Sequence, residues 1–121
     1  MSAGVWIGIG LLGGVGAVAR FLLDGAAGAL SGSSFPFGTL AVNLTGSLAL
    51  GVLAGAVLDE DALSLVAIGA LGSFTTFSTW MFEAQRLAED GEMRIAAINL
   101  LASLALGIAL AWIGLQLGES L

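Results

Sequence analysis

The 121-residue chain contains no cysteine, no histidine and no lysine. Without cysteine it can form neither disulfide bonds nor thiolate metal sites. Without histidine and lysine it lacks the commonest acid–base side chain and the usual Schiff-base amine. The sequence also has no nucleophile paired with a base, no paired carboxylates in an apolar segment and no metal-ligand cluster. We therefore predict that the protein is not an enzyme.

Charged residues are also scarce, at 10% of the chain, whereas soluble domains carry about 25%. The three basic residues are all arginines, too few for a nucleic-acid-binding surface. Hydrophobic residues make up 58% of the chain, which predicts one integral membrane unit spanning residues 1–121, with lipid as its surroundings. The net charge of −6 either points to a salt-loving host or means little in so small a chain.

Four apolar segments approach the length of about 20 residues needed to cross a bilayer, and they are Val5–Leu23, Gly38–Leu58, Ala62–Phe82 and Ile95–Leu117. The predicted connections are Asp24–Phe37, Asp59–Asp61 and Leu87–Arg94. No basic residue precedes the first segment, so it is predicted to be a membrane helix and not a signal peptide. The predicted fold is all-α and multi-pass, with both termini on one side of the membrane.

The third segment combines membrane-spanning length with an unusual density of hydroxyl side chains, namely Ser73, Thr75, Thr76, Ser78 and Thr79. Serine and threonine side chains compete with the helical backbone for hydrogen bonds, and Gly72 adds conformational freedom. We predict a helix interrupted at mid-membrane. Non-helical backbone at that depth requires burial in protein or a water-filled path.

Two polar stripes recur at helical spacing, Asn43-Ser47-Gly51 and Asn99-Ser103-Gly107. Each places its residues on one helical face, where they either join helices or turn donors toward an ion path. Phe74, Phe77 and Trp80 are spaced by three residues, which suits packing or a pore wall. Glu83 is either an intramembrane functional carboxylate or a side chain that reaches the membrane surface.

Three blocks of the sequence resemble the small fluoride channels of the Fluc/CrcB family. They are Gly13-Gly-Val-Gly-Ala-Val-Ala-Arg20, Phe37-Gly-Thr-Leu-Ala-Val-Asn43 followed by Gly46 and Ser47, and Gly72-Ser-Phe-Thr-Thr-Phe-Ser-Thr79. The last block is highly specific, and the resemblance extends over nearly the whole chain.

This resemblance implies an antiparallel dimer of four-helix subunits with two fluoride pathways. It implies a structural, non-transported Na⁺ held by the backbone carbonyls of Gly72 and Thr75. The fluoride pathway then comprises Asn43, Phe77, Trp80, Thr79, Glu83 and Ser103, and Arg20 matches a family arginine near the end of the first helix.

Trp80 stands where the resemblance leads us to expect a second phenylalanine. The larger indole could narrow the pore, add a hydrogen bond to the ion, or mark an idle pathway. Arg20, Arg86 and Arg94 all fall on one predicted side, which by the positive-inside rule places both termini outside. The partner subunit is therefore either a second copy in dual topology or an oppositely oriented homologue.

The leading functional interpretation is a passive channel that exports fluoride across the cell membrane and reduces fluoride toxicity. One alternative is a small four-helix multidrug/proton antiporter that uses Glu83. Another is a packing subunit that transports nothing alone.

Overall fold

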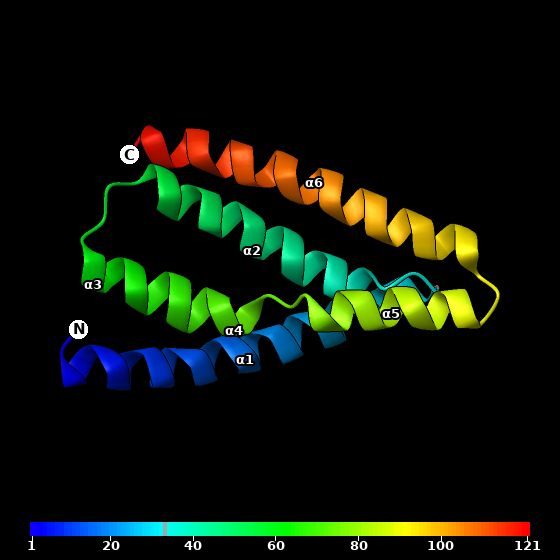
Figure 1. Ribbon diagram of the computed structural model, residues 1–121, viewed down its shortest axis with the longest axis horizontal. Helices are drawn as coiled ribbons and strands as arrows, with labels where there is room; N and C mark the ends of the chain where they lie inside the picture. Colours follow the sequence, from blue (N-terminus) through cyan, green and yellow to red (C-terminus); the bar gives the residue numbers. More distant parts are fainter. Residues whose placement is uncertain (33) are drawn as a thin grey trace.

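The computed structural model describes residues 1–32 and 34–121, and within these ranges the regular structure is helical throughout. Four segments are long and apolar enough to cross a membrane, Ala3–Leu30, Phe37–Gly55, Glu60–Glu89 and Met93–Glu119. They run up and down the long axis of the molecule, and both termini lie at the same end (Figure 1). The chain is thus a multi-pass membrane protein with four spanning segments.

The first helix, α1 (Ala3–Ser31), continues well past its predicted end at Leu23. It begins where the Ser2 hydroxyl accepts the Val5 N–H at 3.2 Å, and it ends at Gly32, whose φ of 60° is left-handed. The alanines after Asp24 favour helix, so the predicted connection starting at Asp24 was wrong. Ser33 of that connection lies outside the described residues.

The second helix, α2 (Phe37–Gly55), ends three residues before the predicted Leu58 because Ala56 is extended, with ψ 135°. The short helix α3 (Glu60–Leu63) then begins under an aspartate cap, in which the Asp59 carboxylate accepts the Ala62 N–H at 2.7 Å. The predicted acidic turn therefore serves as a helix start.

The third spanning segment consists of four elements. The helix α3 is followed by η1 (Ser64–Leu71), which has the wider winding of a π-helix, by α4 (Gly72–Phe74) and by α5 (Ser78–Glu89). Because α5 extends to Glu89, the third span continues past the apolar segment that ends at Phe82 and into the predicted connection Leu87–Arg94. The turn that follows is short and uses Gly91, with φ 81°. The last helix, α6 (Met93–Glu119), is slightly longer than the predicted Ile95–Leu117.

Glycines bring α2 and α6 into backbone contact over their second halves. A Cβ atom on Gly51 would overlap the Ala111 carbonyl oxygen, and one on Gly114 would overlap that of Leu48. Small residues permit such close approach in lipid, where packing and not water exclusion drives helix association. This seam fixes α6 beside α2.

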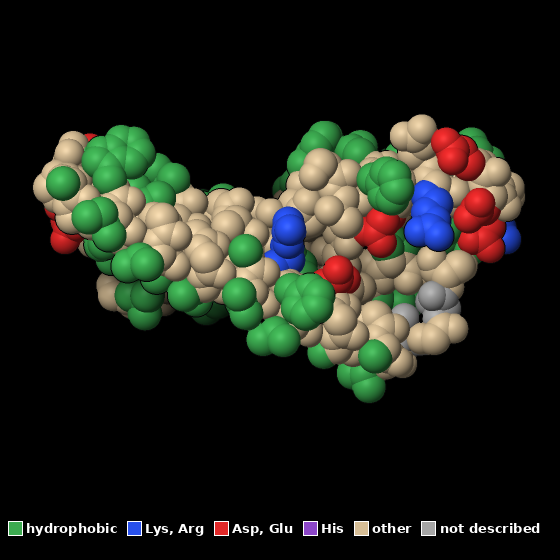
Figure 2. Space-filling view, turned by 90° about the horizontal axis from the view of Figure 1, so that it is seen from below, with side chains coloured by type: hydrophobic (Ala, Val, Ile, Leu, Met, Phe, Trp, Pro, Cys, Tyr) green, Lys and Arg blue, Asp and Glu red, His purple; other side chains and the backbone are tan. Residues whose placement is uncertain are grey.

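Among the described residues the buried apolar side chains are Val5, Val42, Ala84, Leu87 and Ala96. Large apolar side chains such as Trp6, Leu11 and Trp112 are exposed. Figure 2 shows hydrophobic side chains spread over one face, with most charged groups toward the end that carries the α5–α6 connection. An apolar exterior of this kind suits a lipid environment.

Candidate functional site

The third segment stops being helical at Thr75, whose φ of −82° and ψ of 160° are extended, and becomes helical again at Ser78. The hydroxyls before the interruption bind carbonyls of the preceding turn. Ser73 Oγ donates to the oxygens of Gly69 and Ala70 at 3.0 and 3.1 Å, and Thr75 Oγ1 donates to Leu71 O at 3.1 Å. Such side-chain bonds to backbone carbonyls compete with the helical hydrogen bonds and favour a departure from the helix here.

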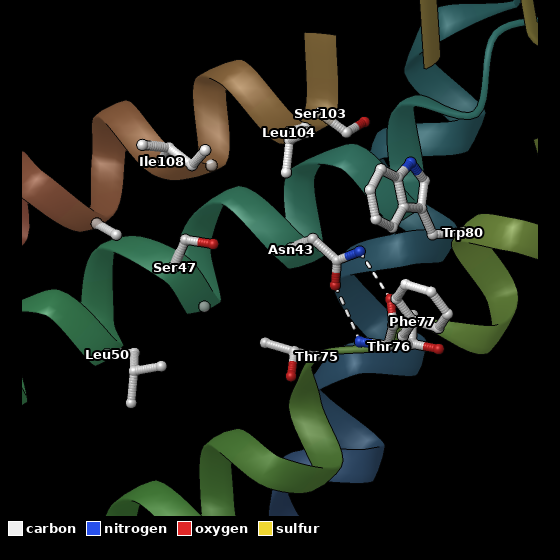
Figure 3. A pocket seen from close by; sticks show the side chains of 13 residues that line it. Asn43, Ser47, Leu50, Thr75, Thr76, Phe77, Trp80, Ser103, Leu104 and Ile108 are labelled. Carbon is white, nitrogen blue, oxygen red and sulfur yellow. Dashed lines mark hydrogen bonds between the residues drawn. The ribbon is translucent and has the colours of Figure 1, made fainter. Parts of the chain in front are cut away.

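The Asn43 side chain of α2 forms two hydrogen bonds with the backbone of the interruption. Its Nδ2 donates to Thr76 O at 2.8 Å, and its Oδ1 accepts the Thr76 N–H at 2.9 Å (Figure 3). The amide thereby satisfies both peptide groups that the broken helix leaves unpaired at this residue. A primary amide carries two N–H donors, so one remains beyond the bond to Thr76 O.

The same rearrangement frees two backbone carbonyls. In a continuous helix the Thr76 N–H would bond to Gly72 O and the Thr79 N–H to Thr75 O. Here the Thr76 N–H goes to Asn43, and the Thr79 N–H goes to Thr76 Oγ1 at 3.2 Å. The carbonyls of Gly72 and Thr75 have thus lost their helical donors, and hard oxygen ligands of this kind suit Na⁺. Both residues thus have carbonyl oxygens available to a cation, and their binding of Na⁺ stays a prediction.

Close packing holds α2 against the interruption at Gly46. A Cβ atom there would overlap Thr75 Cγ2. Glycine is therefore needed for the approach that brings Asn43, one turn earlier, into contact with Thr76.

A cavity of about 410 Å³ lies between α2, the interruption and α6. Its polar lining consists of Asn43, Ser47, Thr75, Thr76 and Ser103. Its larger apolar and aromatic lining consists of Leu50, Phe77, Trp80, Leu104 and Ile108 (Figure 3). The wall thus combines hydrogen-bonding groups with aromatic rings.

The two aromatic rings of this wall meet edge to face. The centroids of Phe77 and Trp80 are 5.7 Å apart and their planes are inclined by 83°. Trp80 Nε1 donates to the backbone oxygen of Asn99 at 3.3 Å. The donor that distinguishes tryptophan from phenylalanine is therefore engaged with α6, while 70% of Phe77 is exposed.

The remaining predicted residues lie away from this cavity. Thr79 and Arg20 line a second hollow of about 120 Å³ together with Asp24 and Thr39, and Thr76 is common to both hollows. Glu83 accepts a hydrogen bond from the Thr39 hydroxyl and lines a third hollow beside Arg86. Gly72 lies in α4 and lines none of the three hollows.

Arg20 is 11 residues before the end of α1 at Ser31, and not near that end as predicted. At 1.5 Å per residue this is roughly 16 Å along the helix. Arg20 therefore lies within the spanning segment, beside Asp24 in the second hollow.

Two residues that the sequence did not assign to the site contact residues that it did. Thr76 contributes its backbone to Asn43, and Thr39 bonds to Glu83. Thr39 extends the Asn43 stripe backward by four residues on the same helical face. Thr76 stood out in the sequence only as one of the hydroxyls of the third segment, because its partner is 33 residues away.

These features define a four-helix membrane protein whose third span is interrupted beside a donor-lined cavity. The sequence matches the family described as "CrcB-like protein, Camphor Resistance (CrcB)" over residues 7–115. The chain belongs to this family, as its motifs predicted.

Relatives are similar over nearly their entire length. "Fluoride-specific ion channel FluC 2" of Mycolicibacterium paratuberculosis is 47% identical over 118 residues, covering 98% of this chain and 97% of the relative. The protein of the same name in Mycobacterium tuberculosis is 47% identical over 114 residues, 94% and 90% of the two chains. "Fluoride-specific ion channel FluC" of Geobacter sulfurreducens is 43% identical over 120 residues, 95% and 97% of the two chains.

Proposed function

We propose that this chain is a subunit of a fluoride-selective channel that lets fluoride leave the cell down its gradient through the plasma membrane. The observation that carries the proposal is the double hydrogen bond between Asn43 and Thr76 at the wall of the donor-lined cavity. The names of the relatives favour the same conclusion. They are named as ion channels, so an enzymatic activity is not proposed.

The cavity wall suits a small, strongly hydrated anion. Fluoride must exchange water for other donors, and the free N–H of Asn43 and the hydroxyls of Ser47 and Ser103 are donors. An aromatic ring has a positive edge and a negative face, so Phe77 can meet the anion edge-on. From this cavity the path continues past Thr76 to the hollow that holds Arg20 and Thr79, and ends beside Glu83.

The working unit is a dimer of oppositely oriented copies. The large exposed fraction of Phe77 and the open side of the cavity favour a partner that completes the wall. The orientation bias is weaker than the sequence suggested, because Arg20 lies within α1 and only Arg86 and Arg94 remain at one end. A homodimer is therefore preferred over pairing with a fixed, oppositely oriented homologue.

Na⁺ would be held by the carbonyls of Gly72 and Thr75 as a structural ion at the centre of the dimer. Two such sites brought together by a two-fold axis supply four oxygens. The ion would neutralise the partial negative charge of these carbonyls, which have no helical donor.

The test is fluoride efflux from liposomes that hold only the purified chain, followed with a fluoride electrode and compared with chloride efflux. The proposal predicts rapid fluoride release and chloride release at the protein-free rate. Equal release of both anions would refute selectivity, and release of neither would refute the channel. Accessibility of a C-terminal tag from both faces of intact and permeabilised cells would support the homodimer.

A further inference from the structure

Asn99 carries a buried donor without a partner. Only 1% of the residue is exposed, and its Nδ2 has no hydrogen-bond partner among residues 1–32 and 34–121. Leaving a buried amide N–H unpaired costs free energy, and each such exception in a folded protein requires an explanation. Its Oδ1, in contrast, accepts the hydroxyl of Ser103 at 3.4 Å, one turn along α6.

The bond to Asn99 decides what Ser103 offers to the cavity. A serine hydroxyl has one hydrogen and two lone pairs. When its hydrogen points to Asn99 Oδ1, Ser103 presents only lone pairs to the cavity that it lines. Lone pairs repel an anion, so this arrangement opposes fluoride binding at Ser103.

Rotation of the amide by 180° reverses this polarity. The oxygen and nitrogen of an asparagine amide are nearly identical in shape and exchange places in the rotation. Nδ2 then donates to Ser103 Oγ, which removes the unpaired donor and releases the serine hydrogen toward the cavity. The carbonyl oxygen takes the unpaired place, and an unsatisfied oxygen is tolerated more often than an unsatisfied N–H.

The rotation requires no movement of α6. The backbone oxygen of Asn99 is bound by Trp80 Nε1, and the glycine seam fixes α6 against α2. The main chain of Asn99 is therefore held, and the rotation involves only one side-chain bond.

We propose that Asn99 is a positioning residue that acts through Ser103: its rotated amide donates to Ser103 Oγ, so that the serine hydroxyl is a donor and not an acceptor toward the cavity. This inference rests on the proposed fluoride channel and deepens it. Asn99 does not touch the ion. It sets the polarity of a residue that does.

The test compares fluoride efflux from liposomes holding wild type, N99D, N99L, S103A or N99D/S103A. A carboxylate only accepts hydrogen bonds and keeps the Ser103 hydrogen turned away from the cavity. The fluoride efflux rate of N99D is therefore expected to be on the order of tenfold lower than that of wild type. N99L leaves the hydroxyl unoriented, and its loss is expected to be about threefold. In the S103A background N99D should cause no further loss.

Additivity of the two substitutions would overturn the proposal, because residues that act as a unit show strong coupling. An additive loss would mean that the new charge alone repels the anion. Wild-type efflux at the protein-free rate would refute the channel itself. If wild type releases fluoride above the protein-free rate and the losses of the two variants are additive, only the role of Asn99 is refuted.

A second measurement needs no charged variant and decides the question if N99D does not fold. The chain has only two asparagines, Asn43 and Asn99, so selective ¹⁵N-asparagine labelling gives two side-chain NH₂ groups. Fluoride is expected to shift the Asn99 NH₂ resonances in wild type and to leave them unchanged in S103A. The same response in both proteins, or none in wild type, would overturn the proposal.

Discussion

The side-chain amide of Asn43 replaces the helical hydrogen bonds that Thr76 has lost, by accepting its N–H and donating to its carbonyl. A residue of the second span thereby holds the non-helical part of the third. The bond to Asn43 Oδ1 diverts the Thr76 N–H that would otherwise reach Gly72 O, so one side chain links the cavity wall to the proposed sodium site.

Replacing Asn43 by alanine should therefore destabilise the protein. Both backbone groups of Thr76 lose their partner, and an unsatisfied buried group costs about 1–3 kcal/mol. Thermal unfolding in detergent is expected to show that the free energy of unfolding falls by roughly 2–5 kcal/mol. Ser47→Ala, one turn along the same wall, is the matched control and should lose less than about 1 kcal/mol. Equal stability of the two variants would mean that the bonds to Thr76 contribute nothing.

The packing of Gly46 on Thr75 predicts a rescue. Gly46→Ala places a methyl group where Thr75 Cγ2 lies, and such overpacking costs about 1–3 kcal/mol. Thr75→Ser removes that methyl group and keeps the hydroxyl, so G46A/T75S should recover most of the stability and flux lost in G46A. Gly14→Ala, where an added Cβ meets open space, is the neutral control. A double variant no better than G46A would show that the contact is unimportant.

Trp80→Phe tests whether the indole N–H serves the ion or the fold. Because Nε1 is bonded to Asn99 O, its removal should lower the free energy of unfolding by about 1 kcal/mol. The fluoride flux should fall by less than about threefold. A far larger loss of flux at unchanged stability would assign this donor to the ion.

The sequence predicted the four spans because apolar length alone marks a membrane helix. The helix ends depended on local features that hydropathy does not report, such as the Asp59 cap and the alanines that carry α1 past Asp24. Asn43, Phe77, Trp80 and Ser103 line one cavity, whereas Thr79 and Glu83 of the same predicted pathway line two other hollows. The hydrogen-bond partners of Asn43 and of the Trp80 indole depend on three-dimensional contacts. The π-helical winding of Ser64–Leu71 was not predicted, because no local sequence pattern indicated it.

Glu83 distinguishes the channel from the antiporter. Its carboxylate accepts the Thr39 hydroxyl and lies beside Arg86, and we expect no proton-coupled cation transport. Liposomes with an imposed pH gradient should take up a lipophilic cation no faster with the protein than without it. Uptake that Glu83→Gln abolishes would favour the antiporter.

Sodium should stabilise the protein without crossing the membrane. A ligand that binds only the folded state adds about 2.7 kcal/mol at 100 times its dissociation constant. The unfolding temperature should rise when Na⁺ replaces a large organic cation, whereas ²²Na⁺ flux should equal that of protein-free liposomes. Stability that is independent of Na⁺ would argue against the carbonyl site at Gly72 and Thr75.

The most direct test of the account is fluoride efflux measured side by side for wild type and Asn43→Ala, in liposomes that contain only this chain and Na⁺ on both sides. The account predicts release well above the protein-free rate for wild type and at least about a tenfold slower release for the variant. The variant lacks the N–H proposed to bind the anion, and about 1.4 kcal/mol added to the transport barrier is a tenfold change in rate. Equal rates of release from wild type and N43A would contradict the account, whatever their value.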